Sequence, residues 1–235
     1  MTGLLSTSIN VLVAPRNEVD NIISHPRLSL IPFAALLVLF AVLWFKYYAN
    51  VDFEWYKNRM LTDAIMQNPE VPVYAMEENM QNVTPSLTLA VNMFSGTMAI
   101  IILLVVRSLY LSIASNIIKQ SRINITHWFA ISAWSTLPIS LVMIGALLYF
   151  SGEDMRYLPI EAINYMSLNN LFFNFSSSHP WAALFNTIDI SMLWSFTIIA
   201  LMFSKLTSIG PIQSAAISTL PFLLIYGIWS ASILL

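Results

Sequence analysis

The sequence predicts an all-α protein, a polytopic bundle of five transmembrane helices with short interfacial helices. Hydrophobic residues make up 57% of the 235 residues and charged residues only 9%, with a mean hydropathy of +0.72. Soluble domains carry about 25% charged residues. Five continuous apolar stretches approach the roughly 20 residues needed to cross the hydrocarbon layer, and their continuity excludes a transmembrane barrel. They cover residues 28–45, 87–106, 128–150, 184–203 and 214–234.

The segment before the first span predicts a short interfacial helix that begins at Pro15, since proline suits the first turn of a helix. Val19, Ile22 and Ile23 then share one helical face. An ordinary surface turn is the alternative. The segment lacks a basic stretch and a small-residue cleavage site, so we expect the first span to remain as an anchor. With most residues in spans, we expect a single integral membrane domain over residues 1–235.

The loop at residues 46–86 opens with a mixture of aromatic and charged side chains that is typical of the headgroup layer. It predicts a helix that ends at Asn68 and Pro69, because proline disfavours the helical conformation of the residue before it. Pro85 then starts the second span. Apolar residues recur at helical spacing in 109–118, so we expect this span to continue past the bilayer as an amphipathic helix.

Prolines interrupt two spans. Pro138 in the third span and Pro221 in the fifth lack an N–H, so each frees a backbone carbonyl that a neighbouring group must satisfy. We expect a kink at each of them. Trp128 opens the third span and is assigned to the aromatic belt at the membrane surface.

The segment at residues 160–183 alternates asparagine and serine with aromatic residues. It is too polar to span the membrane and too apolar to extend freely into water, so we place it in the outer interface. A sixth crossing in this segment is the alternative. That crossing would move the C-terminus to the other side.

Basic residues beside the spans predict the orientation, because cytoplasmic loops retain lysine and arginine. With five spans, one side carries six basic residues and the other carries four. The six are Arg16, Arg27, Arg107, Lys119, Arg122 and Lys205, and the four are Lys46, Lys57, Arg59 and Arg156. The count predicts a cytoplasmic N-terminus and a C-terminus on the opposite, periplasmic side.

Asp189 is the only carboxylate inside a predicted span, with Asn186 three residues earlier on the same helical face. A charged acid near the membrane centre costs about 2.5–3.5 kcal/mol on insertion scales, so it is expected to face the bundle interior. Arg107, at the end of the second span, is expected nearer the inner side, which argues against direct contact. Backbone amides, Asn186 or hydroxyl groups are the expected neighbours. A structural role, a transport role and a location without special function remain open.

Enzyme motifs are missing from the sequence: it has no zinc-protease, nucleophile-elbow, P-loop or dinucleotide-binding pattern. One acid within the spans is too few for a membrane aspartyl protease. His25, His127 and His179 lie in different loops and are not expected to bind a metal. There is no cysteine and no basic patch for nucleic acid. We therefore expect no catalytic, cofactor-binding or metal-binding residues.

Several short motifs resemble the Ypt/Rab-interacting (Yip) membrane protein family, in its bacterial branch. In the second half they are Trp134-x-x-x-Pro138, Leu184-x-x-x-x-Asp189-x-x-x-x-Trp194, Lys205-x-Thr207 and Pro221, and in the first half Pro15 and the segment 46–55. The resemblance covers essentially the whole chain. It implies a five-helix bundle with a cytoplasmic N-terminus, and it selects Asp189, Trp194, Pro138 and Pro221 as residues to test.

In eukaryotic relatives, the resemblance implies vesicle trafficking through Rab GTPases. The segment before the first span is too short for the long cytosolic region those relatives use, so no Rab partner is expected. We expect instead a non-enzymatic inner-membrane scaffold or organiser that engages lipids or other membrane proteins. The alternative is a small transporter or lipid-translocating protein with Asp189 in a hydrated cavity. Gly227 and Ala231, four residues apart, favour a close helix contact in a homo-oligomer.

Overall fold

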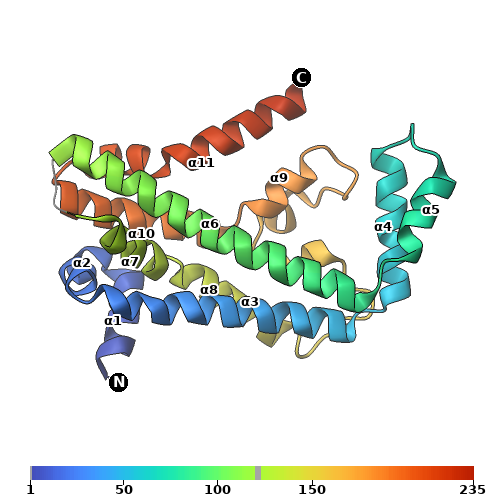
Figure 1. The fold of residues 1–235 in the computed structure, drawn as a ribbon, viewed down its shortest axis with the longest axis horizontal. Helices are drawn as coiled ribbons and strands as arrows, with labels where there is room; N and C mark the ends of the chain where they lie inside the picture. Colours follow the sequence, from blue (N-terminus) through green and yellow to red (C-terminus); the bar gives the residue numbers. More distant parts are fainter. Residues whose placement is uncertain (1, 120–122) are drawn as a thin grey trace.

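The computed structural model describes residues 2–119 and 123–235 and has the architecture of an all-α bundle (Figure 1). Five of the described helical segments are long and apolar enough to cross a membrane, which confirms the predicted fold class. They are Pro26–Asn50 (η1, Pro26–Ser29, with α3, Leu30–Asn50), α6 (Pro85–Lys119), Ile125–Tyr149 (α7, Ile125–Trp134, with α8, Leu137–Tyr149), α10 (Ile190–Thr207) and α11 (Pro211–Leu234). Arg122, counted above, lies outside the described residues.

Two short helices precede the first span. The predicted helix at Pro15 is α2 (Pro15–Ser24), and its residues Val19 and Ile22 are buried against the bundle. Before it lies α1 (Thr2–Val13), an apolar helix that the sequence analysis did not predict. The two helices form a hairpin, in which Asn10 Nδ2 donates to Glu18 Oε1 at 2.6 Å. This hairpin packs on α7 and α10, at the end of the bundle where α3 begins.

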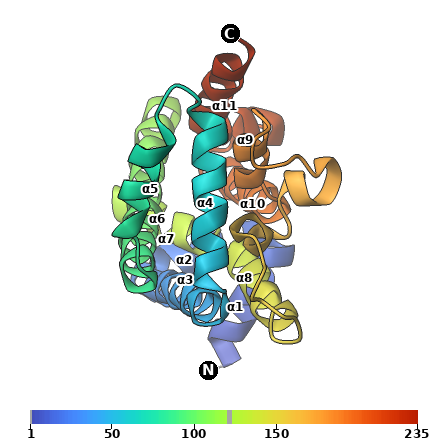
Figure 2. The same cartoon turned by 90° about the vertical axis from the view of Figure 1, so that its right-hand side faces the viewer.

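The loop between the first two spans, residues 51–84, forms α4 (Phe53–Gln67) and α5 (Val73–Gln81). It is called the first outer loop after the orientation predicted from the sequence, and residues 150–189 are called the second. Asp52 caps α4 by accepting a hydrogen bond from the Trp55 amide at 3.0 Å, and Asn68 ends the helix as predicted. In Figure 1, α4 stands across the end of α3 and α6, and Figure 2 looks at the bundle from this end. This helix therefore covers one end of the bundle rather than extending it.

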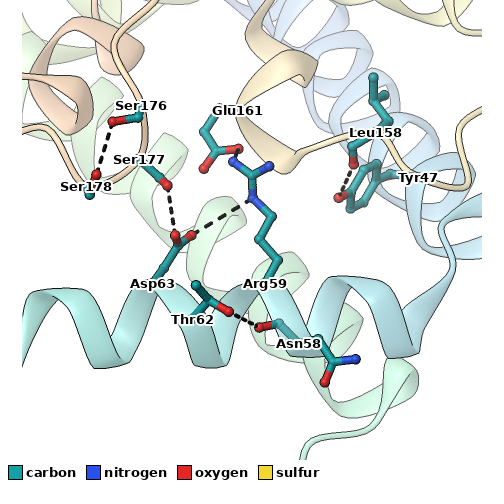
Figure 3. Close-up of polar contacts among 10 residues, drawn as sticks. All are labelled: Tyr47, Asn58, Arg59, Thr62, Asp63, Leu158, Glu161, Ser176, Ser177 and Ser178. Carbon is teal, nitrogen blue, oxygen red and sulfur yellow. Dashed lines mark hydrogen bonds and ion pairs between the residues drawn. The ribbon is translucent and has the colours of Figure 1, made fainter.

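Polar contacts join the two outer loops (Figure 3). Arg59 in α4 lies 3.2 Å from Glu161 in the second loop and 3.9 Å from Asp63. Asp63 also accepts from Ser177 Oγ at 2.8 Å, and the Tyr47 hydroxyl donates to the Leu158 carbonyl at 3.0 Å. The outer segments therefore form one connected layer over the end of α3.

The segment at residues 160–183 contains only short helices: η2 (Ile160–Asn164), η3 (Asn169–Phe173) and the start of α9 (Ala182–Thr187). None has the roughly 20 residues needed to cross a bilayer, so the sixth crossing does not form. The chain reverses at Asn174, whose φ of 52° lies in the left-handed region. The fourth span starts at Ile190, later than the residue 184 predicted from the sequence.

Helix α6 presents its polar residues to the protein and its apolar residues outward. Arg107, Ser108, Ser112 and Ser115 are buried against other helices, and the outward side is apolar. Exposed on that side are Val105, Val106, Leu109, Ile113 and Ile117. Such an arrangement suits a lipid surrounding, where apolar side chains cover the outside and small polar ones pack between helices. The helix continues to Lys119 as expected, and at about 52 Å it is longer than the roughly 30 Å hydrocarbon layer. The expectation that its last part lies past the bilayer stays a prediction.

The two interrupting prolines have different effects on their spans. The span of Pro138 breaks into α7 and α8 at Ser135 and Thr136. Pro221 lies inside α11 and cannot donate to the carbonyl of Ile217, four residues earlier. That carbonyl instead accepts a hydrogen bond from the Tyr110 hydroxyl of α6 at 2.7 Å.

Tyr110→Phe is expected to lower the free energy of unfolding by about 1 kcal/mol. The reason is that the Ile217 carbonyl, inside a membrane helix, loses the hydroxyl that donates a hydrogen bond to it. Pro221→Ala returns a backbone N–H that can serve the same carbonyl. The loss on Tyr110→Phe should therefore shrink in a Pro221→Ala background. Denaturant unfolding of the four proteins in detergent measures the coupling, and equal losses in both backgrounds would disprove it.

Two hydrophobic clusters form the core, one at each end of the bundle. The cluster near α1 and α2 includes Trp128, which is fully buried, lies 5.3 Å from Phe203 between ring centroids, and donates to Ser115 Oγ at 3.0 Å. Its assignment to the surface belt was wrong, because α2 and α6 cover this end of α7. The other cluster contains Tyr47 and Phe150 and lies under the outer loops.

Candidate functional site

Asp189 lies immediately before the first residue of the fourth span, α10, and acts as the N-cap of that helix. Its Oδ1 accepts hydrogen bonds from the Met192 amide at 2.7 Å and from Ser191 Oγ at 2.6 Å. The prediction that Asp189 lies inside the fourth span was therefore wrong, because α9 ends at Thr187 and α10 begins only at Ile190. The expected partners, a backbone amide and a hydroxyl, are confirmed.

Asn186 belongs to α9 rather than α10, so it shares no helical face with Asp189. Its backbone carbonyl accepts from Asn164 Nδ2 at 2.9 Å, and its side-chain oxygen is buried without a partner. Asn186 therefore ties α9 to the second outer loop. Trp194, in the next turn of α10, is 41% exposed and donates to the Leu12 carbonyl of α1 at 3.3 Å.

Asp189→Asn is expected to leave the free energy of unfolding unchanged, because asparagine caps a helix about as well as aspartate. Asp189→Ala removes the cap and should cost about 1 kcal/mol. Thermal unfolding in detergent compares the two variants. A loss with asparagine as large as that with alanine would show that the charge itself is required.

Among the charged residues of the described spans, Arg107 lies farthest along the chain from a helix end. It is only 5% exposed and precedes the end of α6 at Lys119 by twelve residues, which is about 18 Å of helix. The other charged residues of the described spans, Arg27, Lys46, Lys119 and Lys205, lie close to helix ends. None of the described spans contains a carboxylate. The buried charged side chain of the described spans is therefore a base, not the predicted acid.

The break between α7 and α8 supplies the acceptors for Arg107. Its Nη2 donates to the Ser132 carbonyl at 2.6 Å and to Ser135 Oγ at 3.2 Å. In a continuous helix the Thr136 amide would donate to the Ser132 carbonyl, but here it donates to the Ala133 carbonyl. The Ser132 carbonyl is therefore available to accept from Arg107. Ser195 of α10 donates to the Ser135 carbonyl at 2.5 Å, so three spans meet at this break.

Several polar atoms near this break lack partners. Arg107 Nε, Ser132 Oγ and Ser140 Oγ are buried without a hydrogen bond in the structure. None of the ion pairs among the described residues includes Arg107. A buried guanidinium with an unused donor and no counter-charge is costly in a membrane, and such residues mark functional positions. We therefore take Arg107 and the break beside it as the candidate site.

The structure brings few of the sequence-selected residues together. Pro138 lies at the start of α8 next to the break that holds Arg107, whereas Pro221 lines a groove that Arg107 also lines. Asp189, Asn186 and Trp194 lie elsewhere, around the start of α10. The sequence analysis missed Ser132, Ser135, Ser195 and Tyr110 as contributors. Small polar residues at helical spacing after Arg107, namely Ser108, Ser112 and Ser115, were the available signal that this face is buried.

Comparison with known proteins identifies a family and no individual relative. A search of curated proteins and a search of solved structures give no significant match. The family model of the Yip1 domain matches residues 9–232. This match covers α2, all five spans and the outer loops, in agreement with the five-span bundle described above. The chain is a multi-pass membrane protein and belongs to the Yip1 domain family.

Proposed function

We propose that this protein is a non-enzymatic membrane scaffold or organiser, which engages lipids and other membrane proteins through α6 and α11. The observation that carries the proposal is the uneven burial of the spans. Only 6% of the most apolar window of α6, and of α11, is buried inside the chain, against 50% for Ile125–Tyr149 and for α10. The most apolar 18 residues of each of these two helices therefore offer a long apolar surface to the membrane, while other residues of α6, such as Leu111, pack in the core.

Helix α11 supports this proposal in two further ways. It leans away from the other spans toward the C-terminus (Figures 1 and 2). A side chain added at Gly227 would meet nothing within 4 Å, so the glycine that favours a close helix contact is unused inside the chain. A second copy of α11 or a helix of another membrane protein fits this surface.

The proposed location is a bacterial inner membrane with a cytoplasmic N-terminus. Because Arg107 lies within α6, it is removed from the count of basic residues beside the spans. Five basic residues then remain on the predicted cytoplasmic side, against four on the opposite side. With Asp189 outside the fourth span, ten of the twelve acidic residues lie in the two outer loops, which is consistent with this orientation. The bacterial assignment rests on the resemblance of the opening segments.

The alternative of a transporter built around Asp189 has less support. Its carboxylate caps α10 through two hydrogen bonds, and this accounts for the residue without an ion or substrate. A buried arginine beside a groove is a better starting point for any role that involves lipids.

Photo-crosslinking in native membranes tests the scaffold proposal. A photoreactive residue at Ile228, which is 70% exposed on α11, should give adducts with lipids or with other proteins. The same probe at Ile198, which is 1% exposed in α10, is the matched control and should react within the chain. Adducts to a second copy would identify a homo-oligomer. Identical intramolecular products from both positions would contradict the proposal.

A further inference from the structure

A polar pocket lies between α2 and the end of α10, at the end of the bundle where the α1–α2 hairpin packs (Figure 1). It has a volume of about 490 Å³, within the range of small-molecule sites. Two of its lining residues are basic, three carry a hydroxyl or amide group, and none of these described residues is acidic. The lining consists of Arg16, Asn17, Ser204, Lys205, Ser208 and Ile209.

The two basic side chains of the pocket are accessible and have no counter-charge. Arg16 donates through Nη2 to Ser204 Oγ at 2.6 Å, which holds its guanidinium beside α10. Within residues 2–119 and 123–235, Lys205 has no hydrogen bond or ion pair, and Arg16 has no ion pair. Both residues are exposed, so they can contact an anion outside the chain.

A third basic side chain approaches the same end of α10. Lys119 Nζ donates to Ser208 Oγ at 2.7 Å and to the Leu206 carbonyl at 3.4 Å. Another carbonyl at this helix end, that of Ser204, accepts from the Ser208 amide at 2.9 Å. Groups of the protein therefore already compensate part of the negative charge at the end of the helix dipole.

The acidic residues of α2 do not neutralise these basic side chains. Glu18 accepts from Asn10 Nδ2 at 2.6 Å and from Asn21 Nδ2 at 2.9 Å, within the α1–α2 hairpin. Asp20 lies one turn after Arg16 and is exposed, and none of the ion pairs between described residues joins the two. The positive charge of the pocket therefore remains available to an external anion.

The position of the pocket favours an anion that belongs to a lipid. Lys205 lies two residues before the end of α10 at Thr207, and basic residues at the ends of spans reach the headgroup layer. Counting back from it in steps of four residues, the ridge on the surface of α10 consists of Leu201, Thr197 and Leu193. Leu193 is 50% exposed and Thr197 is also exposed. Acyl chains can therefore lie along this ridge when the head group is in the pocket.

We infer that this pocket binds the phosphate group of an anionic phospholipid, with the phosphate on Arg16 and Lys205 and the acyl chains along α10. Phosphate oxygens accept charge-assisted hydrogen bonds from both types of side chain. The described lining offers no carboxylate to an ammonium group, so a head without one, as in phosphatidylglycerol, is complementary to the pocket. The site lies on α2 and α10, so this inference goes beyond the α6 and α11 surfaces of the proposed function.

Native mass spectrometry of the purified full-length protein in detergent tests the inference. The probes are phosphatidylglycerol and phosphatidylcholine with identical acyl chains, and the first should bind at least about fivefold more tightly. Lys205→Gln should weaken phosphatidylglycerol binding about fivefold, and the double variant Arg16→Gln/Lys205→Gln at least about tenfold. Lys205→Arg keeps the charge and should keep the affinity.

Lys57→Gln is the matched control, because Lys57 lies in α4 at the opposite end of the bundle. This variant also removes one positive charge, and its binding of phosphatidylglycerol should be unchanged. Since Lys205 forms no hydrogen bond with the described residues, its variants should keep the melting temperature of the natural protein.

Equal binding of the two lipids, or an unchanged preference in the double variant, overturns the inference. An equal loss in Lys57→Gln and Lys205→Gln would attribute the effect to net charge and would also contradict it. Displacement of phosphatidylglycerol by an equal concentration of inorganic phosphate would make soluble phosphate the ligand, against the lipid source. Crosslinking from Ile228 reports on α11, so its failure would defeat the scaffold proposal and leave this inference standing.

Discussion

Trp128→Ala is expected to lower the free energy of unfolding by about 3–5 kcal/mol, the usual cost of truncating a buried aromatic side chain. Trp128 is fully buried, packs on Phe203 of α10 and donates to Ser115 of α6. The substitution therefore leaves a cavity where three helices meet and removes the hydrogen bond that Ser115 Oγ accepts, while the one it donates to the Ser112 carbonyl remains. Denaturant unfolding in detergent, followed by circular dichroism, measures the change.

Trp194→Ala is the matched control for this prediction. Trp194 is 41% exposed, and its one hydrogen bond joins the Leu12 carbonyl at 3.3 Å. Its truncation should cost no more than about 1 kcal/mol. If the two tryptophan variants lost similar stability, the assignment of Trp128 to the core at this end of the bundle would be wrong.

Gly96→Leu is expected to destabilise the protein by about 3 kcal/mol, because overpacking forces helices apart. A Cβ at Gly96 would overlap the ring of Phe40 on α3, and that ring is held edge-on against Trp44. The ring of Phe40 therefore occupies the space that a side chain at residue 96 would need. The measurement is the same unfolding assay.

Gly227→Leu provides the matched glycine substitution on the exposed span. Nothing lies within 4 Å of a Cβ at this position, so the monomer should lose no stability. The variant should instead reduce crosslinking from α11 to other proteins or to a second copy. Loss of monomer stability in Gly227→Leu comparable to that in Gly96→Leu would refute the view that α11 faces outward.

The sequence predicted the number of spans and the role of the prolines well, because both depend on local properties. Runs of apolar residues are long enough to be unambiguous, and a proline removes its own N–H whatever surrounds it. The carbonyl freed by Pro221 could be foreseen, but its donor could not. Tyr110 is 111 residues away in sequence from Pro221, and only the packing of α6 beside α11 brings its hydroxyl to that carbonyl.

The position of Asp189 was missed because an apolar run does not reveal a break. Leu184 and Phe185 continue the pattern of the span, yet they belong to the separate short helix α9. A local signal was present, since aspartate is among the best N-cap residues and Ser191 and Met192 follow it. Reading Asp189 as a helix start rather than as a buried acid would have moved the beginning of the span to Ile190.

The importance of Arg107 was missed for a related reason. Counting apolar residues ended the second span just before it, which made it a flanking residue of a cytoplasmic loop. The helix in fact continues to Lys119 with its serines turned inward, and the exposed Ile113 and Ile117 extend the apolar surface. A hydropathy window averages over all helix faces, so it does not show that a polar face is buried between helices.

The stability of Arg107→Met tests most directly whether the buried arginine serves function rather than folding. A cation without a counter-charge in the spans carries a desolvation cost that a methionine does not, and the Ser132 carbonyl keeps the hydrogen bond from Ser135 Oγ. The account predicts that the purified variant unfolds at the same denaturant concentration as the natural protein or at a higher one. A loss of more than about 2 kcal/mol would show that Arg107 holds the α7–α8 break together, and would contradict its assignment as the functional residue of the candidate site.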